Sequence, residues 1–168
     1  ATAWTNLNNP ALNTLQFESI AVHPSDRNLM IGGTQDNGTE YQQTAGGNWS
    51  NAEGGDGGYC LIDQSATDTT NVTMYHTFFN STGTQIGFDR ILNTNCLPIK
   101  NVWPMRGDFG GSADPTIVPC DGTQNYIKNG ININDNVLFY APMALGPGSP
   151  NTVYFGTDRL YRSTDRGD

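Results

Sequence analysis

The chain consists of short runs of β-forming residues separated by turn residues, and it has no helical periodicity. No window of eleven residues places apolar side chains at i, i+3, i+4 and i+7 between capping residues. Apolar and β-branched runs alternate instead with Gly, Pro, Asn and Asp. The sequence therefore predicts an all-β fold, whose clearest strands are residues 15–22, 28–33, 58–62, 72–78, 85–88, 137–141 and 152–155.

One pattern recurs along the chain: a turn with Pro or Asp, an asparagine, a strand, a Gly-rich turn and another strand. Residues 24–34 align without a gap on residues 147–157, and residues 63–77 form a weaker copy. Asn28 and Asn71 are 43 residues apart, a normal length for one four-stranded propeller blade. The repeat predicts antiparallel four-stranded β-propeller blades, because a single blade cannot bury both of its faces.

The last six residues carry a resemblance to a known family. Residues 163–168, Ser-Thr-Asp-Arg-Gly-Asp, resemble the first six positions of the Asp-box, S-x-D-x-G-x-T-W. That turn recurs in the BNR-repeat β-propellers, namely sialidases, the sortilin ectodomain and the xyloglucanase-type glycoside hydrolases. The resemblance implies that Ser163 and Asp165 cap a hairpin through its backbone N–H groups, and that Gly167 has a positive φ.

The resemblance and the repeat together predict the organisation of the chain. Residues 1–92 would form two blade units, and residues 93–135 an insertion or a degenerate blade. Residues 136–168 would begin a further blade that ends in an incomplete Asp-box. We expect about two to three blades of a larger or assembled propeller, completed by the same polypeptide or by other protomers. A compact β-sandwich with a chance Asp-box is the alternative.

Two Gly-rich turns carry the candidate catalytic acids. Residues 34–41 are similar to the T-D-x-G-G-x-Y-R turn, which carries a catalytic carboxylate in xyloglucanase-type propellers, with one residue inserted and the Arg replaced by Gln42. The resemblance makes Asp36 a candidate acid or base, and Asp56 is its natural partner, because glycoside hydrolysis needs two carboxyl groups. The simpler interpretation is that both acids only make Asx hydrogen bonds in turns.

The aromatic side chains near these turns are candidate sugar-binding residues. We expect stacking on sugar faces from Tyr41, Trp49, Tyr59 and Trp103, although packing between blades is the simpler role for Trp49. No arginines occur in the context of the triad with which sialidases hold a carboxylate, so a glycan ligand would be neutral.

Charge and cysteine content limit the partners and the compartment. A net charge of −8 and an acidic pI do not favour binding to the negatively charged backbone of nucleic acid. No apolar run is long enough to cross a membrane. A disulfide between Cys96 and Cys120 would close the long loop between them, and Cys60 is expected to be a buried thiol. These features favour a secreted, extracellular or cell-surface protein, for which we expect no cofactor and no metal. N-glycans are possible at four sequons, Asn37, Asn48, Asn71 and Asn80.

Two classes of function remain open from the sequence. The first is a segment of a secreted propeller that binds or hydrolyses a neutral polysaccharide, with paired carboxylates if it is an enzyme. The second is a non-catalytic extracellular scaffold or adhesion module that binds protein. Both histidines, His23 and His76, follow or end strands and are expected to be structural.

Overall fold

The computed structural model describes residues 15–43, 46–79, 86–94, 105–106, 131–132 and 134–167. Over these ranges the chain forms antiparallel strands and no α-helix, which confirms the all-β prediction. No helix in the described part of the chain is long and apolar enough to cross a membrane.

The strands form three small sheets, each built from strands that follow one another in the chain. The first sheet has the order β1-β2-β3-β4, the second β5-β6-β7-β8 and the third β11-β10-β9. The first contains β1 (Phe17–Val22), β2 (Met30–Thr34), β3 (Gly38–Gln42) and β4 (Ser50–Glu53). The second contains β5 (Gly57–Ile62), β6 (Met74–Phe79), β7 (Ile86–Ile91) and β8 (Met105–Arg106). The third contains β9 (Met143–Gly146), β10 (Ser149–Gly156) and β11 (Leu160–Ser163).

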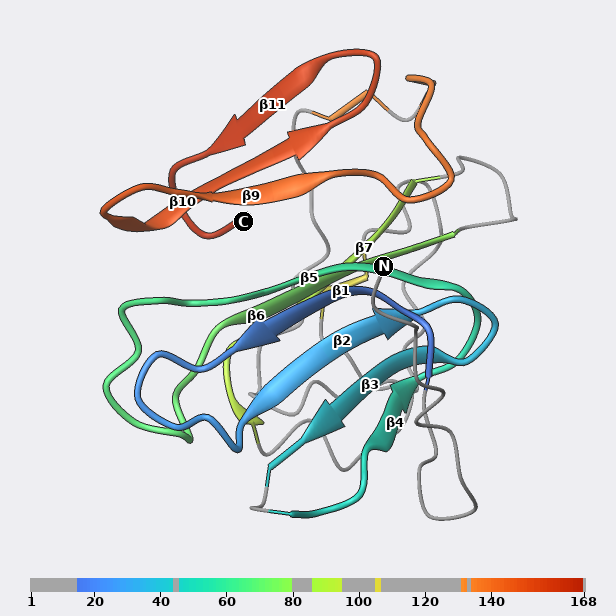
Figure 1. The fold of residues 1–168 in the computed structure, drawn as a ribbon. Coiled ribbons are helices and arrows are strands. Elements are labelled where there is room, and N and C mark those ends of the chain that lie inside the picture. The colour runs from blue at the N-terminus through green and yellow to red at the C-terminus, as the bar shows by residue number, and fades with distance from the viewer. Residues whose placement is uncertain are drawn as a thin grey trace, which may run out of the picture.

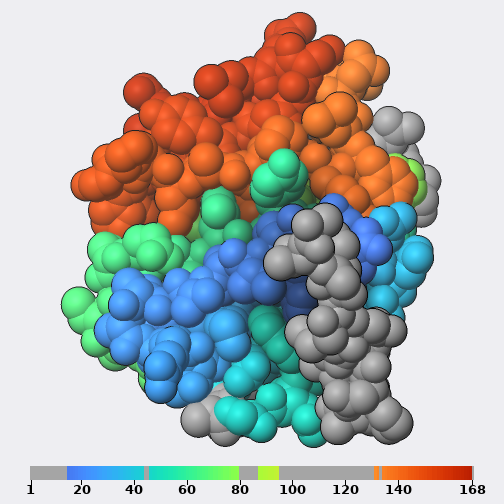
Figure 2. All heavy atoms as spheres, viewed as in Figure 1, coloured from blue at the N-terminus to red at the C-terminus, as the bar shows by residue number. Residues whose placement is uncertain are grey.

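The second sheet lies between the other two, as Figure 1 shows. In the space-filling view, the third sheet forms the orange and red upper part of the molecule, above the blue and cyan surface of the first (Figure 2). Two hydrophobic clusters fill the layers between the sheets. Neighbouring residues of β6 face different layers, because side chains alternate along a strand: Met74 belongs to one cluster and Tyr75 to the other.

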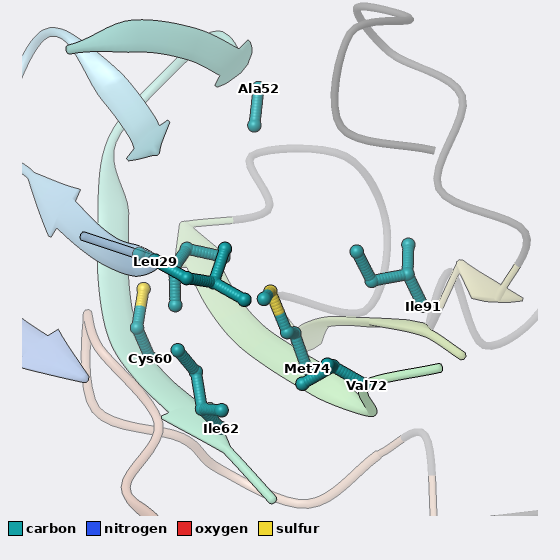
Figure 3. Packing of buried hydrophobic residues seen from close by; sticks show 8 residues of the cluster. Leu29, Ala52, Cys60, Ile62, Val72, Met74 and Ile91 are labelled. Carbon is teal, nitrogen blue, oxygen red and sulfur yellow. The ribbon is translucent and has the colours of Figure 1, made fainter. Parts of the chain in front are cut away.

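The cluster between the first and second sheets is aliphatic, and the other is rich in aromatic rings. Figure 3 shows the aliphatic cluster, which consists of Leu29, Ile31, Ala52, Cys60, Ile62, Val72, Met74 and Ile91. The second cluster consists of Tyr75, Phe88, Ala141, Met143, Val153 and Phe155. The Phe88 and Phe155 rings pack edge to face with centroids 5.6 Å apart, which joins β7 to β10.

The repeated asparagine has an equivalent place in all three sheets. Asn28 and Asn71 lie just before β2 and β6, and Asn151 lies within β10. Each of these strands is the second of its sheet in chain order. The sequence repeat therefore corresponds to a structural repeat.

Two strand predictions differ from the structure. Residues 137–141 were expected to form a strand, but they have no strand conformation, and pairing with β10 begins only at Met143. Pro142, which has no N–H to donate, separates the two segments. A further strand, β8, was not among the predicted strands; it lies inside residues 93–135, for which an insertion or a degenerate blade was expected, and pairs with β7.

Glycines allow the first two sheets to approach each other through their backbones. A Cβ atom built on Gly33 would lie 1.9 Å from the carbonyl oxygen of Gly58, far inside contact distance. Gly38 has φ +90°, and a Cβ there would lie 1.9 Å from the carbonyl oxygen of Glu53. These glycines of the Gly-rich turns therefore serve close packing between strands.

The turn after β11 joins the third sheet to the second. Ser163 Oγ accepts the backbone N–H groups of Asp165 (3.2 Å) and Gly167 (2.7 Å), and its hydroxyl lies 2.5 Å from Asp165 Oδ1. Gly167 has φ +85°. The carbonyl group of Arg166 accepts a 2.6 Å hydrogen bond from Arg90 Nη1 in β7. The residues that resemble an Asp-box thus form a capped turn docked on the second sheet.

Candidate functional site

The structure brings the two predicted acids together at one edge of the molecule. Asp36 lies in the β2–β3 turn, and Asp56 lies in the loop between β4 and β5. The backbone N–H of Asp36 donates a 2.9 Å hydrogen bond to Asp56 Oδ1. Asp36 is exposed and has φ +65°, a left-handed conformation that Asp and Asn adopt more readily than most residues. The Asp56 carboxylate therefore fixes the turn that presents the Asp36 carboxylate.

An aromatic cluster is joined to the Asp56 loop through the backbone of Phe79. The backbone N–H of Phe79, at the end of β6, donates to the carbonyl oxygen of Asp56 at 3.1 Å. The Phe79 ring stacks on Phe139, with centroids 4.1 Å apart and an interplanar angle of 3°. Phe139 in turn contacts Tyr140 edge to face at 4.8 Å, and 47% of Phe139 is exposed. We call Asp36, Asp56, Phe79, Phe139 and Tyr140 the acidic–aromatic edge.

Tyr140 links the aromatic and the acidic parts of this edge. Its ring packs over β5, where a Cβ on Gly58 would lie 2.9 Å from Tyr140 Cδ1. Partial burial raises the pKa of the Tyr140 phenol, and the negative charges of Asp56, Glu18 and Asp36 raise it further. The phenol therefore stays protonated and retains an O–H donor among carboxylates.

A second polar cluster lies buried between the first and second sheets. His76 in β6 has its Nε2 atom 3.3 Å from Glu53 Oε2 in β4 and 3.5 Å from Asp89 Oδ2 in β7. On the other side of the ring, Nδ1 lies 2.9 Å from Thr39 Oγ1 in β3. The side chains of His76 and Asp89 are completely buried, and that of Glu53 is 11% exposed. Four strands of two sheets thus converge on one imidazole ring.

The electrostatics of this buried cluster favour bound protons. Burial lowers the pKa of His76, but hydrogen bonds and charge from Asp89 and Glu53 outweigh that effect and raise it to about 9. Burial and the nearby charge of Glu53 raise the pKa of Asp89. From the sequence, His76 is expected to be structural, and Glu53 and Asp89 are not among the predicted site residues. The available signal was a polar residue inside the apolar run of β6, at a position that faces another sheet.

The predicted sugar-binding aromatic residues do not gather at one place. Tyr41 packs against the aliphatic cluster. The ring centroids of Trp49 and Phe17 lie 4.7 Å apart. Tyr59 is 41% exposed on β5. Trp103 lies outside the described residues. Phe79, Phe139 and Tyr140, which the sequence analysis did not select, are the rings that lie beside Asp36 and Asp56.

The remaining predicted residues have the following places. Cys60 is a free, buried thiol, as expected, and its burial raises its pKa. Cys96 and Cys120 lie outside the described residues, as does the sequon at Asn80. The other sequons, Asn37, Asn48 and Asn71, are exposed.

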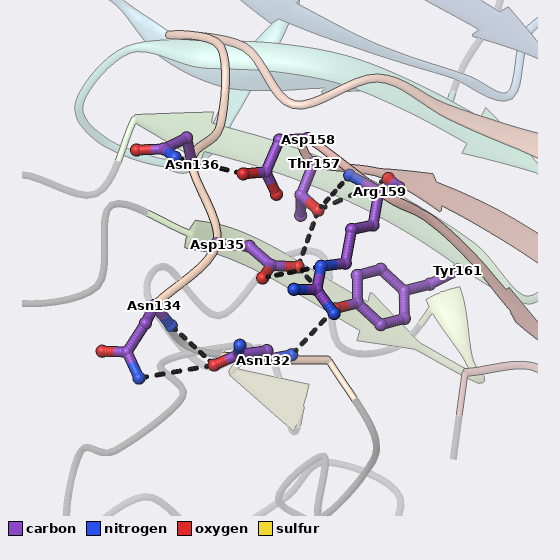
Figure 4. Close-up of polar contacts among 8 residues, drawn as sticks. All are labelled: Asn132, Asn134, Asp135, Asn136, Thr157, Asp158, Arg159 and Tyr161. Atoms are coloured by element: carbon purple, nitrogen blue, oxygen red, sulfur yellow. Dashed lines mark hydrogen bonds and ion pairs between the residues drawn. The ribbon is translucent and has the colours of Figure 1, made fainter.

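Asp135, the acid of an asparagine-rich stretch, is held by the third sheet. Its carboxylate accepts hydrogen bonds from the hydroxyl groups of Thr157, at 2.9 Å, and of Tyr161, and Arg159 Nε lies 3.5 Å away (Figure 4). These contacts, with the Tyr161 hydroxyl first, lower the pKa of Asp135. Asp135 therefore fastens its own segment to the turn after β10 and to β11.

A scan against models of known protein families finds no match to this chain, and no curated protein matches its sequence significantly.

Proposed function

We propose that this chain is part of a secreted BNR-type β-propeller whose acidic–aromatic edge binds a neutral polysaccharide. The observation that carries this proposal is the meeting of Asp36 and Asp56 beside the stacked rings of Phe79 and Phe139. These residues come from the β2–β3 turn, the β4–β5 loop, the end of β6 and the segment before β9. Loops of this kind, on a rigid scaffold, are where binding residues concentrate.

Three features support the propeller part of the proposal. Three antiparallel sheets pack face to face, each formed from consecutive strands. The asparagine repeat marks the second strand of each sheet. The turn at Ser163 has the hydroxyl cap and the positive-φ glycine that an Asp-box has in the BNR propellers.

The chemistry of the edge suits a neutral sugar. Aromatic faces pack on the apolar C–H faces of a sugar ring, and carboxylates accept hydrogen bonds from its hydroxyl groups. An anionic sugar would be repelled, because the negative charges of Asp56, Glu18 and Asp36 act on Tyr140 and the whole chain carries a net charge of −8. The ligand class is therefore an uncharged polysaccharide.

Binding is favoured over hydrolysis by the role of Asp56. A glycosidase uses two carboxyl groups, one as an acid and one as a base or a nucleophile. Asp56 Oδ1 already accepts the backbone N–H of Asp36, so this carboxylate has the role of a turn cap. We therefore assign Asp36 and Asp56 to ligand contact and turn geometry.

Affinity electrophoresis in native gels tests the proposal. The gels would contain xyloglucan, mixed-linkage β-glucan, galactomannan or, as the anionic control, polygalacturonate. We expect at least one neutral polysaccharide to retard the chain and polygalacturonate to have no effect. Phe139→Ala should abolish the retardation because it removes the exposed ring. Leu160→Ala is the matched control, since Leu160 is 75% exposed on β11, away from the edge.

Two results would contradict the proposal. One is retardation that survives both Phe139→Ala and Asp36→Asn in chains that remain folded. The other is no retardation by any neutral polysaccharide. The exposed pair Leu138 and Phe139 would then fit the second functional class, a scaffold that binds protein.

A further inference from the structure

The buried cluster of Glu53, His76 and Asp89 has the donor atoms of a metal site. It offers one imidazole nitrogen and two carboxylate oxygens, and these ligand atoms all lie within 4.8 Å of one another. They come from β4, β6 and β7, so no short sequence motif contains them. Buried ionisable groups are rare unless they pair with each other or coordinate a metal.

The two distances from His76 Nε2 to the carboxylate oxygens suit a single small ion. His76 Nε2 lies 3.3 Å from Glu53 Oε2 and 3.5 Å from Asp89 Oδ2. Donors bound to Zn²⁺ at their usual bond lengths in a tetrahedron are about 3.4 Å apart. The Glu53 and Asp89 oxygens lie within 4.8 Å of each other, and an ion bound to both would draw these two carboxylates to the same separation.

Thr39 supplies the contact that a metal-binding histidine needs on its other nitrogen. Thr39 Oγ1 lies 2.9 Å from His76 Nδ1 and is buried with it. In the metal-bound form Nδ1–H donates to this hydroxyl, and Nε2, which holds a proton when no ion is bound because the pKa of His76 is raised, releases it and gives its lone pair to the ion. The hydroxyl thus fixes both the tautomer and the orientation of the ring.

We propose that Glu53, His76 and Asp89 bind one divalent first-row transition ion, with Zn²⁺ as the best fit, and that Thr39 positions the imidazole. The mixed nitrogen and oxygen set suits Zn²⁺, whereas Ca²⁺ takes six to eight oxygen ligands. Three side chains leave the fourth tetrahedral position to a water or to the second oxygen of a carboxylate, and the complete burial of His76 and Asp89 gives the ion a structural role. It joins β4 of the first sheet to β6 and β7 of the second and stabilises their packing. This inference is independent of polysaccharide binding at the acidic–aromatic edge.

Metal analysis of the whole chain tests the site. The chain would be stripped with a chelator, loaded with Zn²⁺ and measured by elemental analysis and by thermal unfolding. We expect one ion per chain and a higher melting temperature in the loaded form. His76→Gln should lose the bound ion, and Thr39→Val should weaken binding by about 10- to 100-fold, as other contacts to metal-binding histidines do. His23→Gln, at the other histidine, should bind as the wild type does.

Cobalt spectroscopy keeps the test decisive if a variant fails to fold. Co²⁺ added to the stripped wild-type chain should give the intense visible bands of a tetrahedral site, and Zn²⁺ should displace them at one equivalent. The proposal is overturned if the stripped wild type takes up neither ion. It is also overturned if Zn²⁺ uptake is unchanged in folded His76→Gln, because the ion would then lie elsewhere.

Discussion

Asp56 holds the β2–β3 turn in place, because its Oδ1 accepts the backbone N–H of Asp36 at 2.9 Å across 20 residues of sequence. Asp36 has a left-handed backbone at φ +65°, so the bond stabilises a conformation that costs energy for a residue with a side chain. The same contact orders the turn that presents the Asp36 carboxylate.

The first prediction concerns this bond. Asp56→Ala should lower the free energy of unfolding by about 1 kcal/mol, as the loss of a capping oxygen does elsewhere. Asp56→Asn keeps an acceptor oxygen, so it should lower the free energy of unfolding by less than Asp56→Ala does. Urea unfolding of both variants measures the difference. Equal stability of Asp56→Ala and the wild type would mean that the bond does not fix the turn.

The second prediction concerns the close approach of the first two sheets. Gly33→Ala should lower the free energy of unfolding by about 3 kcal/mol or more, because the new methyl group would meet backbone atoms of Gly58 that cannot rotate away. Gly54→Ala is the matched control, since a Cβ there meets nothing within 4 Å. Chemical unfolding compares the two. A tolerated Gly33→Ala would show that β2 and β5 are farther apart than described.

The third prediction is a pH dependence that originates at Asp135. Hydrogen bonds from Tyr161 and Thr157 and the charge of Arg159 hold its folded-state pKa below the unfolded value of about 3.9. The stabilisation is therefore fully present above the unfolded pKa and is lost as the pH falls through the lower, folded-state pKa. Asp135→Asn should be less stable than the wild type at pH 6, and the difference in stability between the two proteins should decrease as the pH approaches 2.

Thermal unfolding of the wild type and of Asp135→Asn between pH 6 and about pH 2 tests the direction of this pH dependence. The comparison with the variant isolates Asp135 from the other acids, which titrate in both proteins. A gap that stays constant or widens toward low pH would show that the Asp135 carboxylate is not stabilised by these contacts.

The sequence was sufficient for the strand content and the repeat, since both depend on local patterns. Runs of apolar and β-branched residues predicted β1 and β6, and the asparagine repeat marked the second strand of each sheet. The prediction of a strand at residues 137–141 was wrong, because an apolar residue of this segment packs through its side chain: the Phe139 ring stacks on Phe79, and the segment has no strand conformation.

The two sites differ in how far the sequence could reveal them. Asp36 and Asp56 stood out because each lies in a Gly-rich turn, and their contact follows from a shared edge. The cluster at His76 could not be found in this way, because Asp89 reaches it through the register of β7 with β6, and Glu53 reaches it from a strand of the other sheet. Only the packing of two sheets places three such residues around one point.

The most direct test of polysaccharide binding is an NMR titration of the ¹⁵N-labelled chain with a xyloglucan oligosaccharide. We predict shifts of the backbone amides in the β2–β3 turn, the β4–β5 loop and residues 138–140, with no change in β11. Oligogalacturonate should cause none of these shifts. Saturable shifts confined to other surfaces, or no shifts at millimolar oligosaccharide, would contradict the account.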